Sequence, residues 1–285
     1  MERLCIRAGQ RALGIIRDGG FRFDRVAAYV GPGVGPRWIV ASGFDLTLLR
    51  SGALGSKSRP VLLAGSSAGA WRFAAWLQPE PEKSYRRLLD AYIGIPCDRR
   101  STPASLKAAL QDVINAYLED DAIPFALAHD HYRIAVTTAR AKNLAASETP
   151  WVQKLGLAMC YVFNRLDRRH LFRFFERVIF HSGPLPPPFC LRPGFRGRAV
   201  ALNPINFKHA VLASGAIPLV IEGVQDIYGA PRGVYRDGGV IDYHLDHDYA
   251  VRPDDVTLLF HHGDRVVPGW LDKTIRGRRP QAEAL

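Results

Sequence analysis

Short apolar runs alternate with stretches of helical periodicity along most of this chain. The apolar runs predict buried strands at 25–30, 61–64, 133–139, 198–202 and 256–260. Helical patterns lie between them, most clearly at 44–49, 68–77 and 105–120. Strands that alternate with helices are typical of a mainly parallel open sheet covered on both faces. The sequence therefore predicts an α/β fold.

The pattern indicates one domain that covers residues 1–285. With 285 residues and 47% hydrophobic content, the chain can bury a substantial core, and no Gly/Ser-rich or Pro-rich linker divides it. The least regular part is 140–195, where an aromatic-rich amphipathic run ends in GPLPPPF. We expect this part to be an insertion or a lid over the edge of the sheet.

The stretch LLAGSSAGAW at 62–71 changes abruptly from an apolar run to a helical pattern. At this junction Gly65, Ser67 and Gly69 spell G-x-S-x-G, in which small neighbours allow a serine on a strained turn with its hydroxyl exposed. Ser67 is therefore a candidate nucleophile. A chain with 26 glycines also produces this motif by chance, so the assignment needs a base and oxyanion donors.

One source of a base is the triad of an α/β-hydrolase, which requires Ser, then Asp or Glu, then His in chain order. Asp264 follows the strand predicted at 256–260, in the manner of the acid of such a triad. No histidine follows Asp264 in the chain. The two nearest histidines, His261 and His262, both come before it. This order makes an α/β-hydrolase esterase the weaker interpretation.

Two later motifs support a different base. A-S-G-A-I-P at 213–218 precedes Asp237, Gly238 and Gly239, and with the earlier G-x-S-x-G this order resembles the patatin-like phospholipases over about residues 25–245. The resemblance implies a three-layer α/β/α sandwich with Ser67 as nucleophile and Asp237 as the base. In that chemistry the aspartate takes the serine proton directly, without an imidazole between them. The resemblance implies no metal and no cofactor.

The resemblance also implies an N-terminal glycine loop, G-G-G-x-R/K-G, whose N–H groups form an oxyanion hole. Aligning Arg37 with the basic residue of that loop places Gly33, Val34 and Gly35 on its three glycines. Val34 replaces the middle glycine and Trp38 replaces the last one. Because a β-branched residue resists a positive φ, we expect this loop to adopt a conformation of its own.

The function implied by the resemblance is hydrolysis of lipid acyl esters, of the phospholipase or lysophospholipase type, through an acyl-enzyme. The substrate would be a phospholipid or another lipid ester. A different class of function stays open. The altered glycine loop is also compatible with a catalytically silent module that keeps the fold and binds membranes.

The net charge of +11 favours anionic partners. Basic residues are dense at 165–180 and at 276–279, and in the first of these runs they are interleaved with Leu, Phe, Val and Ile. This interleaving is typical of an interfacial helix, and no helix-turn-helix or zinc-finger spacing accompanies it. We therefore expect an anionic membrane surface rather than nucleic acid as the partner, with a solvated basic face as the alternative.

Cysteine and histidine usage adds little chemistry. The four cysteines are scattered without a C-x-x-C pair, which favours a reducing compartment. The chain starts without a signal-peptide pattern, and its longest apolar run, 155–163, falls short of the roughly 20 residues that span a bilayer. We expect a cytoplasmic protein with peripheral membrane contact. The His/Asp clusters at 129–131 and 244–248 are interpreted as polar loops rather than metal sites.

Overall fold

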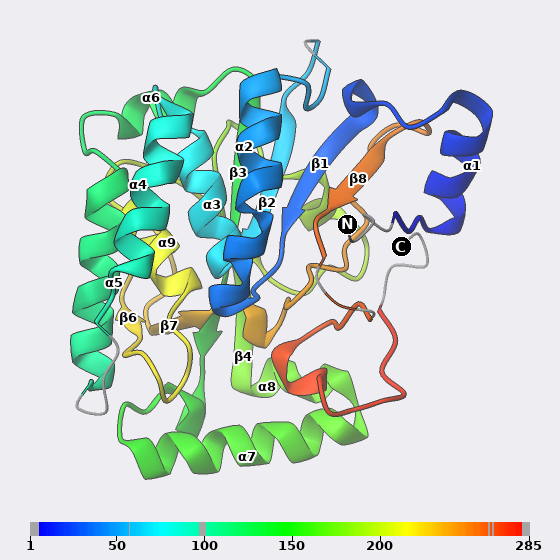
Figure 1. Ribbon diagram of the computed structural model, residues 1–285. Coiled ribbons are helices and arrows are strands. Elements are labelled where there is room, and N and C mark those ends of the chain that lie inside the picture. The colour runs from blue at the N-terminus through cyan, green and yellow to red at the C-terminus, as the bar shows by residue number, and fades with distance from the viewer. Residues whose placement is uncertain (1–5, 57, 97–100, 262, 264, 281–285) are drawn as a thin grey trace.

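The fold is built on one mixed, eight-stranded sheet, seen in a computed structural model that describes residues 6–56, 58–96, 101–261, 263 and 265–280 (Figure 1). The main path has the order β5-β4-β3-β2-β1-β8, and β6 and β7 pair beside it. The strands are β1 (Val26–Gly31), β2 (Val61–Ser66), β3 (Tyr132–Ala141), β4 (Phe175–His181), β5 (Arg198–Ala201), β6 (Val224–Gln225), β7 (Val234–Asp237) and β8 (Val256–Leu259). Strands β8, β1, β2 and β3 are parallel, which confirms the predicted α/β fold with a mostly parallel sheet.

Helices cover one face of the sheet and form its larger core. They are α2 (Ser42–Ser51), α3 (Ala68–Trp76), α4 (Pro81–Ile93), α5 (Pro103–Tyr117) and α9 (Phe207–Ser214). Tyr29 of β1 points to this face, where its ring centroid lies 5.0 Å from that of Phe73 and 5.7 Å from that of Trp76. Burial of these rings, together with Trp71 of the same helix, provides much of the apolar area that stabilises this layer.

The opposite face is covered partly by helix and partly by irregular chain. At the end of β3, Ala139 and Ala141 belong to a cluster with Leu157 and Cys160 of α7 (Pro150–Leu166), next to the short α8 (Leu171–Phe174). Farther along this face, Phe189, Leu245 and Tyr249 from loops cover Ala28 and Val30 of β1. The three layers of the predicted α/β/α sandwich are therefore present. The layer that contains α7 and α8 is only partly helical.

The range 140–195, expected to be an insertion or lid, contains a strand of the sheet. Strand β4 pairs antiparallel with β3 from Ala135↔His181 to Ala141↔Phe175. Only η3 (Asn143–Ala146), α7, η4 (Arg168–His170) and α8 lie between these two strands. The basic run 165–180, expected to resemble an interfacial helix, is thus divided between the end of α7, these short elements and β4. Strand β4 is mostly buried, but the basic side chains within the run interrupt its apolar pattern, so the sequence did not predict it.

The remaining helices lie at the periphery. They are α1 (Gln10–Gly19) and α6 (Ile123–Ala128), and α1 has no buried residue. Among the described residues, no helix combines the length and the apolar character that crossing a bilayer requires.

A fully buried polar cluster ties β1 to three helices. Arg72 of α3 forms a two-point ion pair with Asp45 of α2, with an Nε–Oδ2 distance of 2.6 Å. Tyr29 and Tyr85 donate their hydroxyls to the same carboxylate over 2.6 and 2.5 Å. Because each carboxylate oxygen has two partners, the cost of burying this charge is offset.

Candidate active site

Strand β3 brings the predicted nucleophile and base together because it is longer than its neighbour β2. Residues Tyr132 to Thr137 pair with β2, and the remaining edge, Thr138 to Ala141, pairs with β7 running the opposite way. The last residue of β2 therefore lies opposite Thr137, and Asp237, the last residue of β7, lies opposite Thr138. Two strands that end at adjacent positions of a third must place their following residues side by side.

Ser67 lies on a strained turn between β2 and α3. Its backbone has φ 53° and ψ −126°, a conformation that costs energy for any residue with a Cβ. A Cβ at Gly65 would lie 2.5 Å from the Cα of Ala70, and a Cβ at Gly69 would overlap the carbonyl oxygen of Gly31. Both glycines of the motif are thus required by the close crossing of α3 over β1 and β2.

The Ser67 hydroxyl lies close enough to the carboxyl group of Asp237 to lower its pKa, and both side chains are almost completely buried. Burial raises the pKa of Asp237 to about 7, against the lowering effects of the Ser67 hydroxyl, the Gly239 N–H and the charge of Lys273. The Gly239 N–H donates to Asp237 Oδ1 over 2.7 Å. This carboxyl group is therefore suited to exchange a proton near neutral pH.

The sequence GSSAG offers two serines, and the structure distinguishes them. Ser66 is the last residue of β2, and its fully buried hydroxyl has no hydrogen-bond partner within the described residues. Ser67 instead has the strained backbone and the contact with Asp237. Only Ser67 therefore has the surroundings of a nucleophile.

The segment A-S-G-A-I-P supports both members of the pair. The Ser214 hydroxyl accepts a hydrogen bond from the Ser67 N–H over 2.8 Å and donates to the carbonyl of Thr137 over 2.6 Å. The carbonyl of Ala216 accepts from the Asp237 N–H over 2.9 Å. Sequence reasoning used this segment only as a marker of resemblance and did not anticipate its contacts, which link residues far apart in the chain.

The predicted oxyanion loop lies against the nucleophile, but two of its three N–H groups already have acceptors. A Cβ at Gly33 would lie 3.4 Å from the Cβ of Ser67, which shows how closely the loop approaches. The Gly33 N–H donates to the carbonyl of Tyr243 over 2.8 Å, and the Val34 N–H donates to the carbonyl of Pro32 over 3.0 Å. Their predicted role therefore requires the loop to exchange these acceptors for a substrate oxygen.

Valine at position 34 is accommodated without backbone strain. Val34 keeps a φ of −98°, and the positive φ of this turn, 58°, falls on Gly35 instead. The positive φ falls on the glycine because only a glycine takes the left-handed region at no cost.

The amino end of α3 supplies further donors that the motif comparison missed. The helix begins at Ala68, directly after Ser67, and the N–H groups of a first helical turn lack intrahelical acceptors. In nucleophile turns of this kind the N–H of the residue after the serine serves the oxyanion. The N–H groups of Ala68 and Gly35 are therefore the candidates that this conformation leaves for an oxyanion.

The other histidine and aspartate residues singled out in the sequence are not arranged as a second site among the described residues. The alternative triad is not placed, because His262 and Asp264 lie outside the described residues, and His261 alone is described. His129 Nδ1 accepts from the backbone of His131 and Tyr132. Within the described ranges no group of three or more His, Cys, Asp or Glu side chains is arranged to hold a metal.

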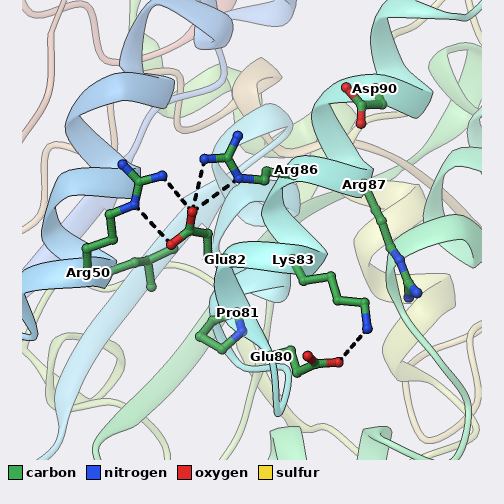
Figure 2. Close-up of a pocket in the computed structure, with 9 residues that line it drawn as sticks. Arg50, Glu80, Pro81, Glu82, Lys83, Arg86, Arg87 and Asp90 are labelled. Atoms are coloured by element: carbon green, nitrogen blue, oxygen red, sulfur yellow. Dashed lines mark hydrogen bonds and ion pairs between the residues drawn. The ribbon is translucent and has the colours of Figure 1, made fainter.

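A surface hollow of about 500 Å³ lies away from the pair, between α2 and α4 (Figure 2). Figure 2 shows that five of its charged side chains are paired with one another: Glu82 accepts from Arg50 and Arg86, and Lys83 donates to Glu80 over 2.7 Å. Neither Ser67 nor Asp237 lines it. This hollow is therefore separate from the candidate active site.

Compared with protein-family models and with curated proteins, the chain matches none of them.

Proposed function

We propose that this protein is a serine acyl hydrolase of lipid esters that uses Ser67 and Asp237 as a catalytic dyad. The single observation that carries the proposal is the close approach of a strained, buried serine to a buried aspartate whose pKa is raised to about 7. Strain and a raised pKa at the same pair of residues are costly for folding, and such costs are concentrated at functional sites.

The geometry supports a two-step reaction. In the first step Asp237 takes the Ser67 proton as the oxygen attacks the ester carbonyl, and it returns this proton to the departing alcohol. In the second step Asp237 takes a proton from water, which attacks the acyl-enzyme and releases the acid as the proton returns to Ser67. Both steps form an oxyanion, and the N–H groups of Ala68 and Gly35 are the proposed donors to it.

The amino end of α3 favours this chemistry further. The partial positive charge of a helix N-terminus stabilises a developing negative charge placed near it. Since Ser67 is the residue directly before α3, the oxyanion would form close to that end.

Exposed apolar side chains in the segments that adjoin the site loops along the chain support a lipid ester over a polar one. Val40 follows the 33–35 loop within η2 (Gly35–Ala41) and is 68% exposed. Val220, two residues beyond the A-S-G-A-I-P segment, is 47% exposed. Apolar surface at the entrance of a site favours substrates with acyl chains.

A second candidate, the catalytically silent module, is favoured by one observation. The Gly33 and Val34 N–H groups are already engaged with protein carbonyls, so the loop in this conformation offers few donors to an oxyanion. A chain of this kind would keep the fold without turnover.

A fluorophosphonate probe and a panel of lipid esters separate the two candidates. The acyl hydrolase should be labelled at Ser67 and should hydrolyse at least one ester, and Ser67→Ala and Asp237→Asn should each lower the rate on the order of 10³-fold or more. Ser66→Ala is the matched control, since it removes the neighbouring hydroxyl and should leave both readouts unchanged. Absence of labelling in a folded wild-type protein would favour the silent module.

A further inference from the structure

Helix α7 exposes a continuous apolar stripe to solvent. Trp151, Leu155, Met159, Val162 and Leu166 recur every three or four residues, so they share one side of the helix. Their exposed fractions run from 39% at Met159 to 74% at Leu166. At about 1.5 Å per residue, the stripe from Trp151 to Leu166 extends over about 22 Å of the helix. A folded chain rarely leaves such a surface uncovered without a partner.

The side of α7 opposite the stripe packs against the protein through specific hydrogen bonds. The exposure of the stripe therefore follows from the way the helix is anchored. Gln153 is buried, donates to the carbonyl of Ser147 over 2.8 Å and accepts from the Leu219 N–H over 2.6 Å. Asn164 is also buried and donates to Asp272 Oδ1 over 2.7 Å. These two buried amides fix the rotation of the helix about its own axis, since turning it would leave them unsatisfied.

Basic residues line one edge of the stripe. Lys154 and Arg165 are exposed on the side of α7 that carries Tyr161. The Tyr161 hydroxyl bonds that of Thr274 over 3.0 Å, which places the C-terminal segment beside this edge. That segment contributes two more exposed basic residues, Arg276 and Arg279.

The acidic groups next to this edge are already neutralised. Asp167 pairs with Arg169 over 2.6 Å, and Asp272 is buried against Arg168 and Arg278. Arg168, which the sequence placed among the candidate membrane contacts, is thus buried in an ion pair and does not face solvent. The edge of the stripe therefore carries a net positive charge.

The stripe also lies at the end of the molecule that holds the candidate dyad. Figure 1 shows α7 lying across the end toward which β2 and β3 run. On its inner side Leu157 and Cys160 share a cluster with Val240 and Ile241, which follow Asp237 closely in the chain. A surface that contacts α7 would therefore be close to Ser67.

We propose that α7 is an interfacial helix that inserts its apolar stripe into an anionic membrane, with the basic edge on the lipid headgroups. An apolar face with cationic residues beside it is the arrangement of helices that lie in the plane of a membrane. The convex side of a single helix fits a fluid lipid surface. A second copy fits less well, because in an antiparallel pair the two basic edges would lie on the same side and repel. The proposal goes beyond the proposed function, since it holds equally for an inactive chain.

The test is binding of the full chain carrying Ser67→Ala to vesicles of phosphatidylcholine with about 30 mol % phosphatidylserine. We expect binding that falls at least about tenfold between low and high salt, and little binding to phosphatidylcholine alone. Trp151 is 69% exposed, whereas Trp38, Trp71 and Trp76 are buried. Brominated acyl chains should therefore quench the fluorescence of Trp151, and Trp151→Phe should abolish this quenching. Such quenching reports insertion of the helix into the acyl chains, because adsorption to the headgroups would not bring Trp151 near the bromine atoms.

Variants separate the apolar and the basic contributions. Leu155→Ser with Val162→Ser should weaken binding on the order of 10²-fold, since each removes a large apolar side chain from the contact. Phe125→Ser with Val251→Ser is the matched control, because both residues are exposed but lie on α6 and just before β8. Lys154→Gln with Arg165→Gln should weaken binding to the anionic vesicles, whereas Lys83→Gln with Arg86→Gln, an equal change in charge on α4, should not.

Three results would overturn the proposal. These are equal binding to neutral and anionic vesicles, equal binding of the stripe variant and wild type, and a dimer in solution that the stripe variant converts to monomer. The last result, measured by analytical ultracentrifugation without lipid, would assign α7 to a second copy instead. Because every vesicle measurement uses Ser67→Ala, failure here leaves the esterase test untouched.

Discussion

Asp237 shows how the surroundings of one residue determine its chemistry. An exposed aspartate is too weak a base to take a serine proton efficiently, but burial raises the pKa of this one to about 7, although Ser67 and the Gly239 N–H both lower it. Lys273, whose Nζ lies 3.9 Å from the ring centroid of Tyr243, keeps a positive charge close enough to limit this rise. The carboxylate is therefore a better base than an exposed one and still ionises near neutral pH.

The pKa of Asp237 predicts the pH dependence of the proposed activity. The base must be a carboxylate, so kcat/KM should rise with pH through about 7 and level off above it. Lys273→Met removes the charge that lowers this pKa and should move the midpoint to higher pH, whereas Lys273→Arg should keep it in place. The measurement is kcat/KM from about pH 5 to about pH 9 on a soluble ester. A midpoint near the ordinary aspartate pKa would show that this carboxyl is not the base.

The same pKa predicts that the dyad costs stability. The folded state holds the Asp237 proton more tightly than the unfolded chain, whose pKa is near 3.8. The contribution of Asp237 to the free energy of unfolding is therefore highest below that pH and decreases as the pH rises to about 7. Asp237→Asn should be more stable than wild type at pH 8, on the order of 2 kcal/mol, and the difference should shrink toward pH 4.

Urea unfolding at the two pH values measures this difference. Asp255→Asn is the control with the opposite sign, because the hydrogen bond and charge of Arg59 lower the pKa of Asp255 against its burial. Its loss should destabilise the protein more at pH 8 than at pH 4. Equal stability of Asp237→Asn and wild type at both pH values would contradict a raised pKa at Asp237.

At the scale of elements, the site depends on how closely α3 crosses two strands. Gly69 of the helix lies against Gly31 of β1, and Gly65 of β2 lies against Ala70. These contacts between backbones place the first turn of α3 directly behind the Ser67 turn. The G-x-S-x-G motif thus meets a packing requirement as well as a chemical one.

Gly69→Ala tests this packing. The added methyl group would overlap the Gly31 carbonyl, so α3 must move away from β1, with a loss of about 1–3 kcal/mol in stability. Displacement of Ser67 should lower the rate on the order of 10²-fold. Gly43→Ala is the matched control, because nothing lies within 4 Å of its added Cβ in α2. If Gly69→Ala kept full activity and stability, the close crossing would not be what positions Ser67.

At the scale of the whole molecule, the Asp45 and Arg72 cluster joins β1, α2, α3 and α4 in one core. Both side chains are essentially inaccessible to solvent, and the tyrosines complete their hydrogen bonds. The cluster is therefore sensitive to loss of one partner, which would leave a buried charge without compensation.

Removal of one partner should destabilise the protein strongly. Arg72→Met leaves the Asp45 charge buried and unpaired, with an expected loss of about 3–5 kcal/mol, and Asp45→Leu in addition should recover part of it. Glu82→Gln, in an exposed ion pair with Arg50, is the control and should change stability little. Urea unfolding measures each change. A single variant as stable as wild type would show that this cluster does not hold the layers together.

The sequence by itself determined what depends on local pattern. Apolar periodicity located the five predicted strands and the main helices, because burial of one face imposes a spacing that a linear reading detects. The motifs also pointed to Ser67 and Asp237, which the structure brings into contact. Both positions follow from short-range rules, since a strand that turns sharply into a helix and a D-G-G turn are each visible within a few residues.

Only the tertiary structure decided what depends on pairing between distant segments. The extra length of β3 places β2 and β7 on one edge, and no local pattern states which strands share an edge. The support of Ser67 by Ser214 and the engagement of Gly33 by Tyr243 are likewise long-range hydrogen bonds. The amphipathic pattern of α7 showed two faces, but the buried amides of Gln153 and Asn164 determined that the apolar stripe points outward. Periodicity defines the faces of a helix, whereas the contacts of the folded chain choose which face is covered.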